Sequence, residues 1–203
     1  MERLIPGEYY HIFNHANGFE DLFREEENFR FFLEKYQLSC DAAVETFAFC
    51  LMPNHYHTLI RVKTHEELIA AKIIEGEMED IQISNAISRQ LSRFFSSYTQ
   101  AFNKVYHRRG SMFIKNYKRK RIDDESYLRE LVLYIHLNPV KHGFRNTPEN
   151  WKWNSFTMAS PEQLNFYHQL FGGETNYLEA IERKRKKLLF VDEFDDIVTL
   201  AEL

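Results

Sequence analysis

Two histidines separated by one residue stand at the start of a segment that predicts a β-strand. His55-Tyr56-His57 opens a run of branched and aromatic residues that extends to Val62, a composition typical of strands. Side chains alternate along a strand, so both imidazoles point to one face, roughly 6.5 to 7 Å apart, and Tyr56 points to the other. Two imidazoles at this spacing can bind one metal ion, although nine histidines in the chain also make a chance pair plausible.

A tyrosine and an asparagine lie one helical turn apart before a proline. Tyr134 and Asn138 are separated by four positions and precede Pro139, so a phenol and an amide share one helical face. A tyrosine on a helix is normally a core residue, and an asparagine before proline is normally a terminator. A phenol oxygen can also attack a phosphodiester and store the energy of that bond as phosphotyrosine, without ATP.

That chemistry would require a divalent cation. The pKa of a free phenol is about 10, so a cation must polarise the phosphate and stabilise the developing charge. The imidazoles of His55 and His57 with the amide oxygen of Asn138 form a donor set that leaves positions open for substrate. This set suits manganese or magnesium in function, and the imidazoles would also accept zinc, nickel or cobalt.

Positive charge is concentrated in one stretch of the chain. The net charge is −4, yet no acidic residue occurs between Asp80 and Asp123, and the rest of the chain has 16 basic against 30 acidic residues. An acid-free run of this length favours a polyanion as partner over a merely solvated face. We therefore predict DNA contacts by its ten basic residues: Arg89, Arg93, Lys104, Arg108, Arg109, Lys115, Lys118, Arg119, Lys120 and Arg121.

The elements that must position these residues alternate between strands and helices. We predict strands at 9–13, 46–52, 55–62 and 117–122, and helices at 21–38, from 84 onward and from 123 to about 137, the last of them stopped by Pro139. This order indicates an α+β sandwich in which helices pack on an antiparallel sheet.

The long helix carries a continuous apolar stripe. Six residues recur at steps of three or four: Ile87, Leu91, Phe94, Tyr98, Phe102 and Tyr106. We interpret the stripe as the core face of the helix, with base stacking as the alternative. The preceding segment, 63–83, is charged and is predicted to be an insertion with partial helix.

Composition argues against a disordered protein, a disulfide-rich protein and a membrane-spanning protein. The chain is 44% hydrophobic, with 18 Phe and 11 Tyr against 7 Gly and 5 Pro, which indicates an ordered globular protein. The first residues lack the apolar core of a signal peptide and no apolar run could span a bilayer, so we expect a cytoplasmic, nucleoid-associated protein without a membrane partner. Cys40 and Cys50 are too few for a disulfide framework and are expected to be small buried thiols.

Two longer motifs resemble one family. Leu51-Met-Pro-Asn-His-Tyr-His57 resembles the His-hydrophobic-His metal motif of the REP-associated tyrosine transposases, relatives of the single-tyrosine insertion-sequence transposases. Tyr134-Ile-His-Leu-Asn-Pro-Val-Lys-His-Gly143 looks like their catalytic-helix motif. Supporting matches are Tyr10-His-Ile-Phe-Asn14, Gly110-Ser-Met-Phe113 and Trp151-Lys-Trp-Asn-Ser155. The resemblance covers residues 7 to 156, in the family's order.

The resemblance implies a role for each motif residue. His55 and His57 would bind the metal, Asn138 would complete the site, and Tyr134 would be the nucleophile that cuts and rejoins single-stranded DNA. A ferredoxin-like core and a substrate containing a DNA hairpin with adjacent unpaired bases are also implied. One departure is Asn116, where relatives commonly have arginine, and this change could weaken a phosphate contact.

The resemblance also suggests the domain organisation. We expect a transposase domain at 1–156, including the insertion at 63–83, and a helical C-terminal extension at 157–203. Within the extension, residues 177–189 predict a basic helix, and the acidic segment 192–196 could cover it or compete with DNA. A plain solvated helix is the alternative.

Two other functions are compatible with parts of the sequence. A DNA-binding protein that keeps the fold but no longer cleaves is disfavoured by the intact His55, His57 and Tyr134. A metalloenzyme that acts on a small molecule is disfavoured by the acid-free basic stretch. For a transposase, we expect a monomer or a homodimer.

Overall fold

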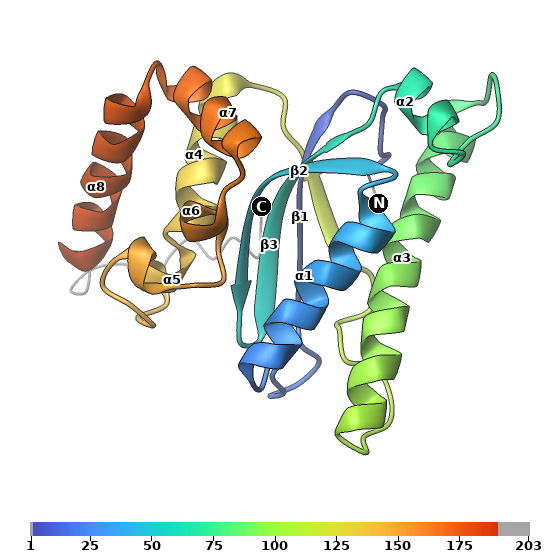
Figure 1. Cartoon of the computed structure of the whole chain (residues 1–203), viewed down its shortest axis with the longest axis horizontal. Coiled ribbons are helices and arrows are strands. Elements are labelled where there is room, and N and C mark those ends of the chain that lie inside the picture. The colour runs from blue at the N-terminus through green and yellow to red at the C-terminus, as the bar shows by residue number, and fades with distance from the viewer. Residues whose placement is uncertain (1, 191–203) are drawn as a thin grey trace. The chain divides into compact units, whose positions relative to one another are not determined.

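The computed structural model describes residues 2–190, which form two compact units. The first unit comprises the chain up to residue 46 and residues 51–121, and the second comprises residues 47–50 and the described chain from residue 122 (Figure 1). The acidic segment 192–196 lies outside the described residues.

An antiparallel sheet forms the frame of the first unit. Its strands are β1 (Tyr9–His15), β2 (Val44–Met52), β3 (His55–Val62) and β4 (Lys118–Arg121), in the order β2-β3-β1-β4. The middle of β2, residues 47–50, groups with the second unit. β1 pairs antiparallel with both β3 and β4. Apart from a short extra helix, the chain follows the β-α-β-β-α-β order of ferredoxin-like proteins, so the predicted fold class is confirmed.

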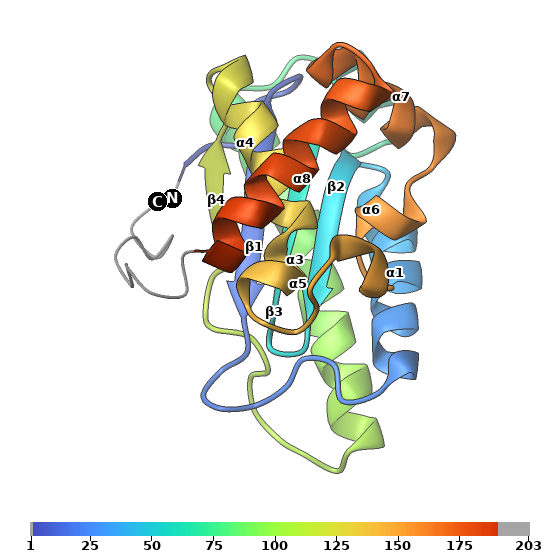
Figure 2. The ribbon, with the colours of Figure 1, turned by 90° about the vertical axis from the view of Figure 1, so that its left-hand side faces the viewer.

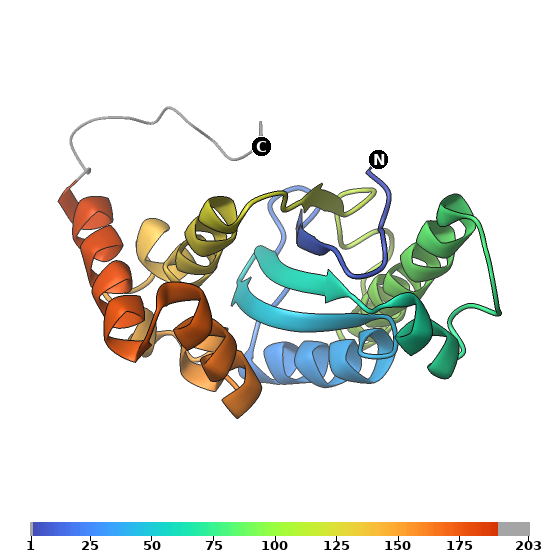
Figure 3. The ribbon, with the colours of Figure 1, turned by 90° about the horizontal axis from the view of Figure 1, so that it is seen from above.

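Two helices cover one face of this sheet. Helices α1 (Glu26–Cys40) and α3 (Asp80–Val105) pack against each other, and Figure 3 shows α1 lying along the strands. The ring of Phe32 in α1 meets Phe94 of α3 edge-on at 4.9 Å between centroids, and it lies 5.5 Å from Tyr56 of β3. Tyr56 therefore points into the helix layer.

The apolar stripe of α3 is its core face, as predicted. The residues from Ile87 to Phe102 on this stripe are buried. Tyr106, which caps the helix, is instead half-buried, and its hydroxyl lies within hydrogen-bond distance of Glu25 and Asn28. Burial of the other five residues leaves them no surface on which bases could stack.

The starts of the two helices differ from the predicted ones. α1 begins at Glu26, later than predicted, because Glu25 and Asn28 form a reciprocal cap. α3 begins at Asp80, earlier than predicted, because Glu79 and Gln82 form another. Glutamate is an uncommon N-cap residue, so neither start has a strong sequence signal. The predicted partial helix in the insertion is α2 (His65–Ala70).

The second unit is helical. It contains α4 (Glu125–His136), α5 (Asn138–Lys141), the 3-10 turn η1 (Pro148–Asn150), α6 (Ser155–Met158), α7 (Pro161–Phe171) and α8 (Glu174–Phe190). Helix α8 packs on α7, α4 and α5, as Figure 2 shows. Residues 157–190 thus share a compact unit with 122–156, and a domain boundary at 156 stays a prediction.

The prediction of a helix that ends near residue 137, before Pro139, is confirmed. α4 ends at His136, and Pro139 stands in the first turn of α5. A backbone N–H has no intrahelical partner at that position, so proline is tolerated there and its fixed φ favours the new turn.

Two expectations from composition can be compared with the described residues. None of the helices within residues 2–190 is long and apolar enough to cross a membrane. Cys40 and Cys50 are buried, as predicted, and burial raises the pKa of both thiols.

The aromatic core of the first unit predicts an asymmetry between two phenylalanines. Phe94→Ala should lower the free energy of unfolding by about 3 to 5 kcal/mol, because it removes a ring from the contact of α1 with α3. Phe19→Ala is the control, since Phe19 is fully exposed, and it should change stability by less than about 0.5 kcal/mol. Thermal unfolding followed by circular dichroism measures both, and equal losses would contradict the assigned core.

Candidate functional site

Four histidines of β1 and β3 share the sheet face opposite α1 and α3. In the register of these strands, Phe13 is opposite His57 and His15 is opposite His55, so their side chains lie on one face with His11. Ring centroids are 4.7 Å apart for His15 and His55, 5.1 Å for His11 and His57, and 5.3 Å for His55 and His57. The sequence predicted only the pair on β3.

Neighbouring side chains orient both predicted metal ligands. Nδ1 of His55 lies 2.8 Å from Oδ1 of Asn54, and Nδ1 of His57 lies 2.9 Å from Nε2 of His11. Burial, with a smaller contribution from Lys120, lowers the pKa of His11 to about 3, so this ring is neutral near pH 7. A hydrogen bond at one ring nitrogen fixes how the ring presents the other. A cation at this face would therefore be bound through Nε2 of His55 and His57.

The histidine face fits part of a metal site rather than a complete one. Among residues 2–190, no group of three or more His, Cys, Asp or Glu side chains is arranged to hold an ion. The two oriented imidazoles fit two positions of a divalent cation. A third protein ligand would have to be of another kind, such as the amide oxygen predicted at Asn138.

The basic strand β4 adds positive charge to the same face. Lys118 is opposite Phe13 and Lys120 is opposite His11, so both lysines lie on the histidine side of the sheet. Nζ of Lys118 is 5.9 Å from the centroid of the Phe13 ring. An anion approaching the histidines would meet these two lysines.

The other two cations of β4 lie on the helix side and have partners within the first unit. Arg119 donates to the hydroxyl of Ser88 at 2.7 Å, and Arg121 pairs with Glu8 at 3.2 Å. Alternation along β4 thus divides one basic run between two faces of the sheet.

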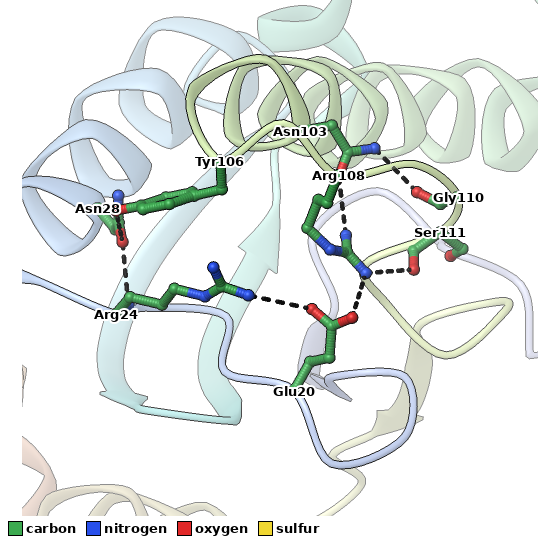
Figure 4. Close-up of polar contacts among 8 residues, drawn as sticks. All are labelled: Glu20, Arg24, Asn28, Asn103, Tyr106, Arg108, Gly110 and Ser111. Carbon is green, nitrogen blue, oxygen red and sulfur yellow. Dashed lines mark hydrogen bonds and ion pairs between the residues drawn. The ribbon is translucent and has the colours of Figure 1, made fainter.

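The guanidinium of Arg108 belongs to a polar network that holds the loop after β1. Its guanidinium donates to Glu20 at 2.9 Å, to Asn103 at 2.8 Å and to the carbonyl of Ser111 at 3.4 Å (Figure 4). Glu20 also pairs with Arg24 at 3.6 Å. Five of the ten predicted DNA-binding residues are instead exposed away from β4: Arg89, Arg93, Lys104, Arg109 and Lys115.

In the second unit, Tyr134 and Asn138 lie where α4 meets α5. Burial raises the pKa of the Tyr134 hydroxyl to about 12, and a hydrogen bond with the Asn138 side chain opposes this shift. Nζ of Lys141 lies 5.0 Å from the centroid of the Tyr134 ring. The phenol therefore keeps its proton at neutral pH, and an attack by its oxygen requires a positive charge that stabilises the anion.

A histidine between these two residues holds the end of α4 in place. His136 is fully buried, with Nε2 2.8 Å from the Ser155 hydroxyl and Nδ1 2.8 Å from the Tyr177 hydroxyl. Burial lowers the pKa of His136 to about 3. A neutral imidazole has one donor and one acceptor nitrogen, which matches two hydroxyl partners. His136 thereby connects α4 with α6 and α8.

Three histidines of these networks, His11, His15 and His136, have no local sequence signal for their contacts. Alternation along β1 could have placed His11 and His15 on one face, but their contacts with β3 depend on a strand register that local pattern does not encode. The partners of His136 come from residues far along the chain.

Comparison with known proteins supports the family resemblance that the motifs indicate. No family model matches the chain. Over 126 residues, 62% of its length, the chain is 25% identical to a Haemophilus influenzae protein that carries the name REP-associated tyrosine transposase. The chain resembles the REP-associated tyrosine transposases. The match spans 66% of that transposase relative, slightly less than two thirds.

A solved structure of a REP-associated tyrosine transposase bound to a REP hairpin has a similar fold. The likeness has a TM-score of 0.53 at 19% identity, and it covers 78% of this chain and 82% of that transposase chain. At this identity the likeness concerns the fold. The sequence comparison thus confirms the family resemblance that the motifs predict, and the structural comparison confirms the fold.

The buried contacts of His136 predict a graded loss of stability. His136→Leu would leave the hydroxyls of Ser155 and Tyr177 without this buried partner, so we expect a loss of about 2 to 4 kcal/mol. Tyr177→Phe removes only one of the two hydrogen bonds and should cost about 1 kcal/mol. Urea denaturation ranks the two variants. A His136→Leu protein as stable as the unaltered chain would show that the network contributes nothing.

Proposed function

We propose that this protein is a divalent-metal-dependent DNA transposase that cuts and rejoins single-stranded DNA beside a hairpin through a covalent bond to Tyr134. The observation that carries the proposal is the orientation of His55 and His57 by Asn54 and His11. Both imidazoles lie on one face of the sheet with Nδ1 engaged, which leaves Nε2 of each ring to face an ion, the arrangement typical of metal-binding histidines. The resemblance to REP-associated tyrosine transposases supports the same function.

In this proposal, His55, His57 and Asn138 would hold the ion, which would be magnesium or manganese. When bound, the ion supplies a Lewis acid that polarises the phosphodiester. Asn138 also positions the hydroxyl of Tyr134 through their hydrogen bond. Lys141, whose Nζ lies 5.0 Å from the centroid of the Tyr134 ring, adds positive charge beside that ring.

The covalent step exchanges one phosphate ester for another. The oxygen of Tyr134 gives up its proton and bonds to phosphorus, the bond from phosphorus to the leaving strand breaks, and the leaving oxygen takes up one proton as a hydroxyl, so no proton is gained or lost overall. The phosphotyrosine keeps the energy of the broken bond, so a strand hydroxyl can later attack it, release Tyr134 and rejoin DNA.

The proposed substrate is a DNA hairpin with adjacent unpaired bases. The solved relative of similar fold is bound to a REP hairpin, and we extend this class of partner to the present chain. Lys118 and Lys120 on the histidine face would contact the phosphates of the strand to be cut. We propose that the protein acts in the cytoplasm as a monomer or a homodimer.

The nucleophile is tested by removing one oxygen. Tyr134→Phe keeps the packing of the ring and should eliminate the covalent protein–DNA adduct, while hairpin binding stays within about twofold. The assay incubates labelled hairpin DNA with protein and manganese, denatures the mixture and measures the shifted band. Tyr127→Phe is the matched control, since Tyr127 lies on the same helix about two turns earlier.

The outcomes separate three interpretations. An undiminished adduct in Tyr134→Phe would refute the mechanism. Loss in Tyr127→Phe alone would move the nucleophile and keep the reaction class. An unaltered protein that binds hairpin DNA in manganese but forms no adduct would be the non-cleaving DNA-binding alternative.

The metal site is tested at the histidine pair. His57→Ala should abolish adduct formation and manganese binding measured by calorimetry, because it removes one of two imidazole ligands, and it should leave the circular dichroism spectrum unchanged. Removing divalent ions with EDTA should have the same effect on the unaltered chain. His107→Ala serves as control, since His107 is exposed. Full metal-dependent cleavage by His57→Ala would contradict the assigned ligands.

A further inference from the structure

The outer surface of α3 carries an open groove of about 410 Å³. Its lining comes entirely from this helix and consists of Arg89, Ser92, Arg93, Ser96, Ser97 and Gln100. Two guanidinium groups, three hydroxyls and one amide line the groove, with neither an acidic nor an aromatic side chain among them. These groups are the hydrogen-bond donors that proteins use to contact phosphate oxygens.

The groove and the histidine face lie on opposite sides of the first unit. Helical periodicity places the groove residues on the side of α3 away from its buried stripe, which includes Leu91 and Phe95. Phe95 on the inner side stacks on Tyr56 of β3 at 5.6 Å, and His55 and His57 point away from Tyr56 across the sheet. The helix alone is about 10 Å thick. DNA in the groove is therefore a different segment from DNA at the histidines.

The two arginines of the groove have no acidic partner among residues 2–190. Arg89 and Arg93 stand one turn apart and are exposed, and neither has an ion pair or hydrogen bond with any residue of the described chain. Arg108 and Arg121, by contrast, are neutralised by Glu20 and Glu8. Two guanidiniums without a partner in the described part of the chain, within an acid-free segment, produce a local positive potential that attracts a polyanion.

The positive surface continues along the helix beyond the groove. Lys104 is exposed and lies one turn after Gln100 on the same side of α3. From Arg89 to Lys104 the helix rises roughly 22 Å. Successive phosphates of a DNA strand advance about 3.4 Å along the duplex axis, so this stripe is long enough to contact several of them.

We infer that this groove is a second DNA site, which binds the sugar–phosphate backbone of the paired hairpin stem without reading its sequence. The absence of an aromatic lining decides between paired and unpaired DNA, since sites for single strands stack bases on aromatic rings. Phosphate contacts position a duplex and carry no sequence information. The inference rests on the proposed function, because it assigns the stem to α3 and leaves the strand to be cut to the histidine face.

The first experiment removes the two groove charges. Arg89→Ala/Arg93→Ala is compared with Arg30→Ala/Lys35→Ala, which removes two positive charges from α1 in the same unit. Binding of a perfectly paired hairpin and of an unpaired strand of equal length is measured between 50 and 200 mM salt, concentrations that span the range where phosphate contacts dominate. The groove variant should bind the stem at least about tenfold more weakly, with a log–log salt slope shallower by about 1.8, because two phosphate contacts are lost.

The preference for paired over unpaired DNA is the decisive readout. The ratio of the affinity for the paired hairpin to the affinity for the unpaired strand should fall in the groove variant and stay unchanged in the α1 variant. A photoreactive group attached through Ser96→Cys should crosslink to stem nucleotides and not to the unpaired flank. Equal weakening of both DNAs in the groove variant, an unchanged salt slope, crosslinks confined to the flank, or no hairpin binding by the unaltered chain would each overturn the inference.

The same samples separate this inference from the proposed function. If the unaltered protein forms no adduct but the groove variant still loses its preference for the stem, the transposase proposal fails and the groove assignment stands. If Tyr134-dependent adducts form and the groove variant binds the stem normally, the groove assignment fails and the transposase proposal stands.

Discussion

Tyr56 is buried between rings from both helices of the first unit, and this burial determines what the opposite face of the sheet can present. Phe32 and Phe95 contact its ring from α1 and α3. Because side chains alternate along β3, a buried Tyr56 directs His55 and His57 away from the core. A shift of one residue in strand register would bury two imidazoles and expose a tyrosine. The chemistry of the histidine face thus depends on the aromatic packing behind it.

Local pattern was sufficient for much of this arrangement. Alternation in His55-Tyr56-His57 gave the correct faces, and the apolar stripe of α3 gave the correct core. Tertiary contacts determine the features that local pattern did not predict. The approach of His11 to His57 depends on the register of β1 with β3, and the helix starts depend on glutamate caps that have little sequence signal. The four-residue spacing of Tyr134 and Asn138 agreed with their hydrogen bond, although their proposed catalytic roles stay predictions.

The basic stretch shows why a count of charges cannot locate a binding surface. In the sequence, the ten cations lie in one acid-free stretch. In the structure, they differ in whether they pair with an acidic residue and in the face of the unit on which they lie. Arg108 and Arg121 neutralise acids that lie far away in the sequence. Lys118 and Lys120 accompany the histidines, and the groove cations lie on the far side of α3. Ion pairs between distant residues are tertiary information, and they leave fewer cations for a polyanion than composition suggests.

The hydrogen bond between Tyr177 and His136 affects how related sequences can diverge and recombine. His136 lies inside the motif that resembles the family's catalytic helix, whereas Tyr177 lies in α8, beyond the segment that this resemblance covers. A recombination event that exchanged only the C-terminal helices between related genes could separate the two. The hybrid protein would then keep every residue of the motif in α4 and still lose the buried hydrogen bond of His136 with residue 177. Positions 136 and 177 should therefore change together during divergence, and motif conservation alone would overestimate which hybrid genes encode a stable protein.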